Sequence, residues 1–149
     1  EGPFVGELDG DAAHDLREAG AEYGAATGRP RRVAWMDIVA TRYGTRLQGA
    51  SALALTKMDV LSYLKQIPVC VAYRLNGEVI ESFPYTCDLY DCEPVYETLP
   101  GWGCDISGVR RWQDLPKEAR DYVEFIEAHV GCPIKYVSVG AEREALIIR

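Results

Sequence analysis

The sequence predicts an α/β fold with a mixed sheet, and three observations support this prediction. Apolar stripes with helical spacing alternate along the chain with short runs that are rich in β-branched residues. The dipeptide Asn76-Gly77 separates two of these runs and is a strong hairpin signal, so we expect an antiparallel hairpin over residues 68–83. A chain of 149 residues with 48% hydrophobic content can bury one core, so we expect one domain.

The first two helices are expected over residues 11–24 and 33–49. The earlier segment has helix-forming composition, and a loop broken by Gly28 and Pro30 follows it. In the later segment an apolar residue recurs every four positions, which predicts one buried stripe on a helix that ends at Gly49. The stripe consists of Trp35, Val39, Tyr43 and Leu47, with Met36 and Ala40 beside it.

The third helix is expected within residues 115–133 and has the clearest pattern in the chain. Pro116 suits the first turn, and Gly131 followed by Pro133 ends the helix. The buried stripe is expected to be Ala119, Tyr122, Val123, Ile126 and Val130.

Strands are expected where short β-rich runs lie between turn signals. Residues 51–58 resemble a buried strand, and the hairpin makes the sheet mixed. A further strand is expected at 94–99, and closing strands at 134–140 and 145–149 flank the turn 140–144. Trp102 and Trp112 are expected to close the edge of the core.

The composition of the chain restricts its cellular environment and the partners that it can bind. The net charge is −7 and the pI is near 4.8, which disfavours attraction to a nucleic-acid backbone or an anionic membrane. No apolar stretch has transmembrane length and no signal peptide opens the sequence, so we expect a cytoplasmic protein. The five cysteines are odd in number and form no C-x-x-C pair, so we expect reduced thiols and neither a disulfide framework nor a zinc site.

The loop "AATGRPRR" (25–32) is the first candidate site. Arg29, Arg31 and Arg32 surround a glycine and a proline, and a guanidinium binds carboxylate or phosphate through a planar fork. Thr27 and the Gly28 amide add neutral donors, so the loop suits an anionic ligand. The alternative is a solvated basic turn.

The second candidate lies in "LALTKMD" (53–59), where an apolar run ends in Lys57 and Asp59. Side chains at i and i+2 share one face of a strand, so both would project into the space at its carboxyl end, where α/β sheets place ligands. One carboxylate can accept both the N1–H and the N2 amino group of guanine, and a lysine stem can cover the ring. The alternative is a solvated ion pair.

The third candidate is "SVGAER" (138–143), where Ser138 and the Gly140 backbone can approach a base edge. Taken in isolation, this segment is better explained as a tight β-turn. His14 and His129 lie on helical stretches and are interpreted as structural. The sequence contains no G-x-x-x-x-G-K-[ST] motif, so it shows a place for a base and none for phosphates.

Together these segments resemble the C-terminal part of the adenylosuccinate synthetase family. The resemblance runs from "GPF" to "ALIIR" through "EYGAATGRPRR", "LALTKMDVL", "VCVAYRL", "EPVYETLPGW", "LPKEARDYVEFIE" and "YVSVGAER". Members of this family use GTP to join L-aspartate to IMP. The resemblance implies that residues 1–149 are the C-terminal portion of a larger mixed-sheet, P-loop-like nucleotide-binding fold, in a cytoplasmic homodimer.

The resemblance also implies roles for the three loops. The loop that closes over L-aspartate corresponds to Ala25, Ala26, Thr27, Gly28, Arg29, Pro30 and Arg31. Within it, Arg29 would contact the IMP ribose and Arg31 would bridge aspartate and GTP. The GTP-binding positions would be Arg31, Lys57, Met58, Asp59, Ser138, Val139 and Gly140.

Three departures from the family pattern are visible: Ala26 replaces a threonine, Ala141 replaces a proline, and Val5-Gly6 replaces Pro-Thr. The resemblance further implies that the phosphate loop, the catalytic Asp and His, the Mg²⁺ site and most of the IMP pocket lie N-terminal to this stretch. We therefore expect no catalytic residue and no metal ligand here, and no activity from the 149 residues alone. A GTPase-like switch and a noncatalytic interaction domain are the alternatives.

Overall fold

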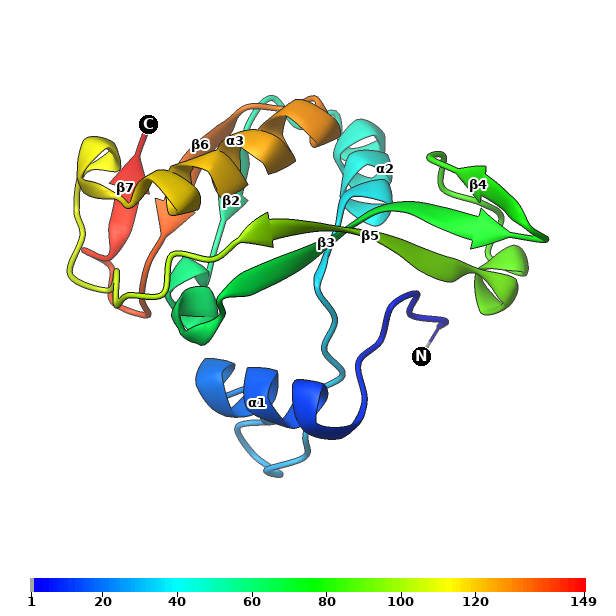
Figure 1. Cartoon of the computed structure of the whole chain (residues 1–149), viewed down its shortest axis with the longest axis horizontal. Helices are drawn as coiled ribbons and strands as arrows, with labels where there is room; N and C mark the ends of the chain where they lie inside the picture. Colours follow the sequence, from blue (N-terminus) through cyan, green and yellow to red (C-terminus); the bar gives the residue numbers. More distant parts are fainter. Residues whose placement is uncertain (1) are drawn as a thin grey trace. The chain divides into compact units, whose positions relative to one another are not determined.

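The computed structural model describes residues 2–149 and is an α/β structure with two mixed sheets (Figure 1). Its chain divides into two compact units, the first made of residues up to Tyr43 with Pro68–Thr98 and the second of Gly44–Ile67 with Leu99–Arg149. The expectation of a single domain stays a prediction. Each unit contains a sheet of its own, and strands do not pair into one continuous sheet over the described residues.

The sheet of the first unit confirms the expected hairpin. Strand β3 (Gln66–Leu75) pairs antiparallel with β4 (Glu78–Ile80) and parallel with β1 (Met36–Asp37), and β5 (Glu93–Pro100) also pairs with β3. Asn76 and Gly77 both have positive φ, 51° and 84°, as the two-residue turn predicted from this dipeptide requires.

The helices of the first unit are α1 (Gly10–Gly20) and α2 (Ile38–Gln48), of which α2 extends past Tyr43. Helix α2 begins five residues later than the sequence pattern predicts. Met36 and Asp37 instead pair with β3, and the Asp37 carboxylate accepts the Ala40 N–H at 2.9 Å as an N-cap. Pairing with a strand distant in sequence therefore decides where this helix starts.

The apolar stripe predicted on α2 is buried only in its first turn. Ile38 and Val39 are buried, whereas Leu47 is 70% exposed, so this part of the prediction was wrong. Tyr43 is 44% exposed and stacks on Phe83 with ring centroids 4.5 Å apart. Val39 belongs to the core of the first unit, together with Val5, Cys70, Tyr73 and Leu89.

The second unit places helix α3 (Lys117–Val130) beside a three-stranded sheet in the order β2-β6-β7 (Figure 1). Strand β6 (Ile134–Ser138) runs parallel to β2 (Leu53–Leu55) and antiparallel to β7 (Leu146–Ile148). Strand β2 is short and half-buried, so the prediction of a buried strand over residues 51–58 was wrong in both length and burial.

The sequence pattern of α3 is confirmed residue by residue. All five members of its predicted stripe are buried: Ala119, Tyr122, Val123, Ile126 and Val130. Pro116 is the N-cap, one position before the first turn, and Gly131 ends the helix with φ of 73°. Glu127 joins α3 to the sheet, because its carboxylate accepts the Ile134 N–H at 2.6 Å and the Arg149 guanidinium at 2.8 Å.

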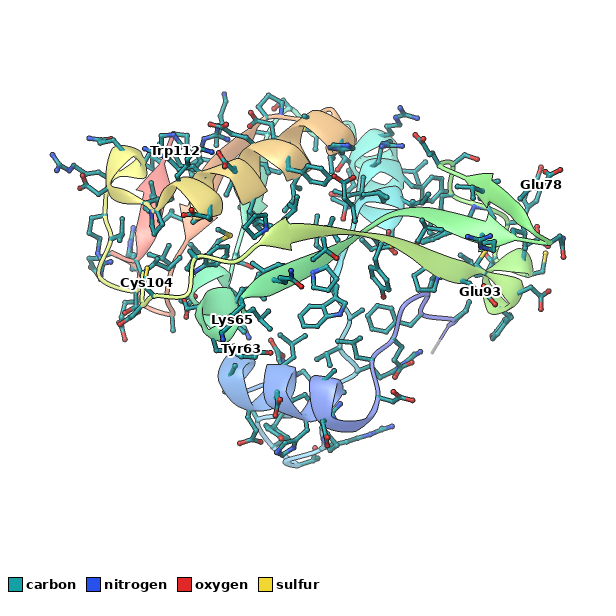
Figure 2. The ribbon with its side chains drawn as sticks, in the orientation of Figure 1. Tyr63, Lys65, Glu78, Glu93, Cys104 and Trp112 are labelled. Atoms are coloured by element: carbon teal, nitrogen blue, oxygen red, sulfur yellow. The ribbon has the colours of Figure 1, made fainter. Side chains whose placement is uncertain are left out.

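The tryptophans of the second unit are placed as expected at its core edge. Trp102 is 7% exposed and donates its indole N–H to Ser62 Oγ at 3.0 Å. Trp112, labelled in Figure 2, is half-buried under the Arg149 guanidinium, 4.1 Å from the ring centre. Three short 3-10 helices complete the structure: η1 (Met58–Tyr63), η2 (Asp88–Asp91) and η3 (Trp112–Asp114). All five cysteines are free thiols in this structure.

Candidate functional site

A backbone ladder in the first unit holds the arginine-rich loop in a bent path. The Gly24 N–H donates to the Arg29 carbonyl at 2.9 Å, and the Arg31 N–H donates to the Glu22 carbonyl at 3.0 Å. Gly28 closes the tip: its φ is +66°, and its N–H donates to the Gly24 carbonyl at 2.8 Å. A left-handed φ at this position favours glycine, which explains the Gly28 of the motif.

The inner side of this loop lines a cavity of about 300 Å³, a volume suited to a small ligand. Thr27 lies in this lining, where its hydroxyl oxygen accepts the Arg29 N–H at 3.3 Å. Ala25 and Ala26 are exposed residues of the same loop. The residues that line the cavity are Gly24, Thr27, Arg29, Pro30, Arg31 and Arg32.

The three arginines of the cavity have different surroundings. Arg31 Nη1 lies 2.9 Å from Glu22 Oε2, and Arg32 is bound to the carboxylate of Glu7. Arg29 is exposed, and within residues 2–149 its guanidinium makes no ion pair. The loop thus offers one unneutralised cation and two paired ones, which supports an anion site over a simple solvated turn.

Glu7 and Glu22 were missed by the sequence reasoning. Glu22 precedes its partner by nine residues, and only the ladder brings the two side chains together. Glu7 precedes Arg32 by 25 residues. The Arg32 guanidinium holds the pKa of the Glu7 carboxyl below its usual value through their hydrogen bond. No periodicity in the sequence marks either pair.

The Lys57–Asp59 segment differs from the expected strand end. Strand β2 ends at Leu55, Lys57 has a left-handed backbone with φ of 61°, and Asp59 lies in the first turn of η1. The argument that Lys57 and Asp59 share a strand face was therefore wrong. A left-handed lysine is uncommon and costs about 1–2 kcal/mol, and such strain concentrates at ligand sites.

Asp59, in the second unit, has a buried carboxylate oxygen without a hydrogen-bond partner. This atom is Oδ1, and no other buried side-chain nitrogen or oxygen in residues 2–149 is left in this state. An unsatisfied buried acceptor costs roughly 1–3 kcal/mol, and more when it is charged. A ligand donor that reaches Oδ1 would remove this cost.

Ser138 is the last residue of β6, Val139 and Gly140 follow it, and η1 packs against this strand. The Ser138 hydroxyl donates to the Gly140 carbonyl at 2.9 Å, and the Val139 N–H donates to the Ala145 carbonyl at 2.9 Å. A Cβ on Gly140 would lie 3.1 Å from the Ala145 Cβ, so the turn is closely packed. The connection from β6 to β7 contains a turn over residues 142–145, where the Ala145 N–H donates to the Glu142 carbonyl at 3.0 Å.

The structure thus places two of the predicted segments, Lys57–Asp59 and Ser138–Gly140, on neighbouring elements of the second unit. Met58 and Val139 are 1% and 0% exposed, so their side chains belong to the core and only their backbones can meet a ligand. The loop at residues 25–31 belongs to the first unit.

Within residues 2–149, no group of three or more His, Cys, Asp and Glu side chains has an arrangement that could hold a metal ion. None of the helices there combines the length and the apolarity needed to cross a membrane.

Comparison with known proteins gives one consistent result. The family model of adenylosuccinate synthetase matches residues 1–147. The adenylosuccinate synthetase of Brevibacillus brevis is 48% identical over 149 residues, and that of Carboxydothermus hydrogenoformans is 51% identical over 148. Each comparison covers 99% of this chain and 35% of the relative, so the chain spans about a third of the length of these relatives.

A solved structure agrees in fold. The fully ligated adenylosuccinate synthetase of Plasmodium falciparum superimposes with a TM-score of 0.93 and 38% identity, over all of this chain and 36% of that one. The family match over nearly the whole chain, the relatives and this superposition lead to one conclusion: the chain belongs to the adenylosuccinate synthetase family.

Proposed function

We propose that this chain is the C-terminal portion of a GTP-dependent ligase that joins IMP and L-aspartate to form adenylosuccinate. In this proposal the chain supplies the guanine pocket and the aspartate loop. Family membership and coverage of 35% of the relatives' length support it. The remaining two thirds of the family's length would supply phosphate binding and catalysis.

The buried, unpartnered Oδ1 of Asp59 carries the proposal. Guanine presents N1–H and the N2 amino group side by side, and both can donate to one carboxylate. Adenine lacks this pair, so a carboxylate at this position selects GTP over ATP. Lys57 is exposed, and its aliphatic stem would cover the ring, while the backbone of Ser138–Gly140 would line the other side.

The loop at residues 25–31 would bind the second substrate. Its cavity of about 300 Å³ suits a small dicarboxylate such as L-aspartate. Arg31 would bind the aspartate carboxylate and reach GTP, and the unneutralised Arg29 would contact the IMP ribose. Thr27 would add a hydroxyl, and Ala26 offers no side-chain donor where the family usually has one.

Mg²⁺ is the metal ion that phosphoryl transfer from GTP would require. The described residues hold no group of ligands that fits it, so we propose that its site lies in the part of the enzyme outside this chain.

The proposal also places the full-length enzyme in the cytoplasm as a homodimer. The 149 residues alone should be inactive, and formation of adenylosuccinate by them would contradict this division of labour.

The test is Asp59→Asn in the full-length enzyme, with kcat/KM measured for GTP and XTP. The amide turns a donor toward guanine and loses an accepted bond, worth roughly 2–4 kcal/mol for a charge-assisted pair, so GTP use should fall about 100-fold. Xanthine carries an oxygen where guanine carries its amino group, so XTP should become the preferred nucleotide while the KM for aspartate changes little.

Asp121→Asn is the matched control. It removes an exposed carboxylate that pairs with Lys117 on α3, and it should leave the preference for GTP intact. If Asp59→Asn lowers the melting temperature and the enzyme still prefers GTP, the carboxylate is a structural element and the guanine pocket is wrongly placed.

A further inference from the structure

Both the backbone and the side chain of Arg31 make hydrogen bonds within the first unit. Its Nη1 donates to Glu22 Oε2 at 2.9 Å, and its N–H donates to the Glu22 carbonyl at 3.0 Å. Its own carbonyl accepts a longer bond of 3.4 Å from the Arg17 guanidinium. The backbone N–H and the side chain of Arg31 are therefore both bound to the single residue Glu22.

The Glu22 contact uses only part of the Arg31 guanidinium. A guanidinium has five N–H donors in a planar fork, and the contact to Glu22 engages Nη1. A carboxylate needs two parallel N–H groups along one edge of the fork. Because the side chain of Arg31 is 57% exposed, the Nε–Nη2 edge can still receive such a ligand.

We propose that Glu22 is a positioning residue for the aspartate loop. It orients the Arg31 fork by binding Nη1, so that the opposite edge is presented to the substrate carboxylate. The inference rests on the proposed function, because it takes L-aspartate as the ligand of this loop. An arginine already held in one geometry loses less rotamer freedom when the ligand binds.

The negative charge of Glu22 should weaken binding of the substrate carboxylate, whereas the ordering of Arg31 by Glu22 should strengthen it. A carboxylate beside the fork repels a second carboxylate, so removing the charge while keeping the hydrogen bond should not weaken binding. Removing both should weaken it, because the ordering is lost. Two variants separate these effects: Glu22→Gln keeps an acceptor oxygen for Nη1, and Glu22→Ala does not.

The experiment measures kcat and the KM of all three substrates in the full-length enzyme carrying each substitution. Glu22→Ala should raise the KM for aspartate about three- to tenfold, the range expected from freeing one long side chain. The KM for IMP and for GTP, and the melting temperature, should change little, because a pair in which Arg31 is 57% and Glu22 20% exposed is still reached by solvent, and such pairs contribute little to stability. Glu22→Gln should have an aspartate KM equal to or below that of the parent.

A control removes another Arg–carboxylate pair, one that is more exposed than Glu22–Arg31. Asp114→Asn breaks the exposed pair with Arg111, whose side chains are 68% and 43% exposed, and should leave every KM unchanged. Arg31→Leu tests the proposed function itself, because an aspartate KM unaffected by it would remove aspartate from this loop altogether.

The remaining outcomes decide the role of Glu22 when Arg31→Leu does raise the aspartate KM. An unchanged or lowered KM in Glu22→Ala would overturn the proposal, since Glu22 would then be a bystander or a competitor of the substrate. Equal rises in Glu22→Ala and Glu22→Gln would also overturn it, because the charge and not the Nη1 bond would be responsible. A parallel rise for all three substrates with a lower melting temperature would show a structural role only.

Discussion

Gly101→Ala should destabilise the chain more than a surface substitution does, because two backbone segments meet at this glycine. A Cβ at Gly101 would lie 2.0 Å from the carbonyl oxygen of Leu64. The segments would have to separate by about 1.4 Å to reach the 3.4 Å of ordinary contact. The Gly101 N–H donates to the carbonyl of Lys65, labelled in Figure 2, at 2.9 Å, and this separation breaks the bond.

The magnitude follows from these two effects. Forcing extra atoms into a packed site costs roughly 1–3 kcal/mol, and losing one backbone hydrogen bond costs roughly 0.5–1.5 kcal/mol. The free energy of unfolding should therefore fall by about 2–4 kcal/mol, out of the roughly 5–15 kcal/mol that is usual for a folded protein. A loss of this size lowers the melting temperature by roughly 5–15 °C for a chain of this length.

Urea unfolding followed by tryptophan fluorescence measures the effect. Trp102 is adjacent to Gly101 and only 7% exposed, so its contribution to the emission, which adds to those of Trp35 and Trp112, reports loss of structure at this place. Gly108→Ala is the matched control, because no atom lies within 4 Å of a Cβ built there, and its stability should stay within about 0.5 kcal/mol of the parent. Equal unfolding midpoints for the two variants would refute the reasoning.

Two further predictions concern groups in the core of the first unit. Burial raises the pKa of the half-buried Asp37 above its ordinary 3.8, so the folded state binds this proton more tightly; stability should fall as pH rises from about 3.8 through the folded pKa. Urea unfolding across this pH range should show that the free energy of unfolding falls in the parent and not in Asp37→Asn. The same pH dependence in both proteins would contradict this prediction. Burial also raises the pKa of the Cys70 thiol to about 12, so iodoacetamide at pH 8 should label exposed Cys87 and Cys104 and spare Cys70 until urea is added.

The elements that could be predicted from sequence are those governed by local signals. Helix α3 has a complete apolar stripe with stop signals, and all of its expected core residues are buried. The Asn76-Gly77 hairpin needs two consecutive residues with positive φ, and few other dipeptides adopt that conformation readily. In both elements the decisive information lies within one short segment.

The predictions from sequence were wrong where a contact between residues far apart in the sequence decides the structure. Met36 pairs with Val69 in β3, and this pairing removes residues 33–37 from the helix that their stripe suggests. The left-handed backbone of Lys57 has no sequence signal, since lysine rarely adopts it. The three candidate loops were predicted from their residue chemistry and their roles from the resemblance, whereas their geometry, including the Glu22–Arg31 pair, required the structure.

The carboxylate of Asp37 has a consequence for the order of folding. One of its oxygens caps α2 through Ala40, three residues away, and the other accepts the hydroxyl of Tyr73, 36 residues away in β3. A buried carboxylate is costly until both donors are in place. The first turn of α2 and the docking of β3 should therefore form as one cooperative step, and hydrogen exchange should show both segments opening together with the same free energy.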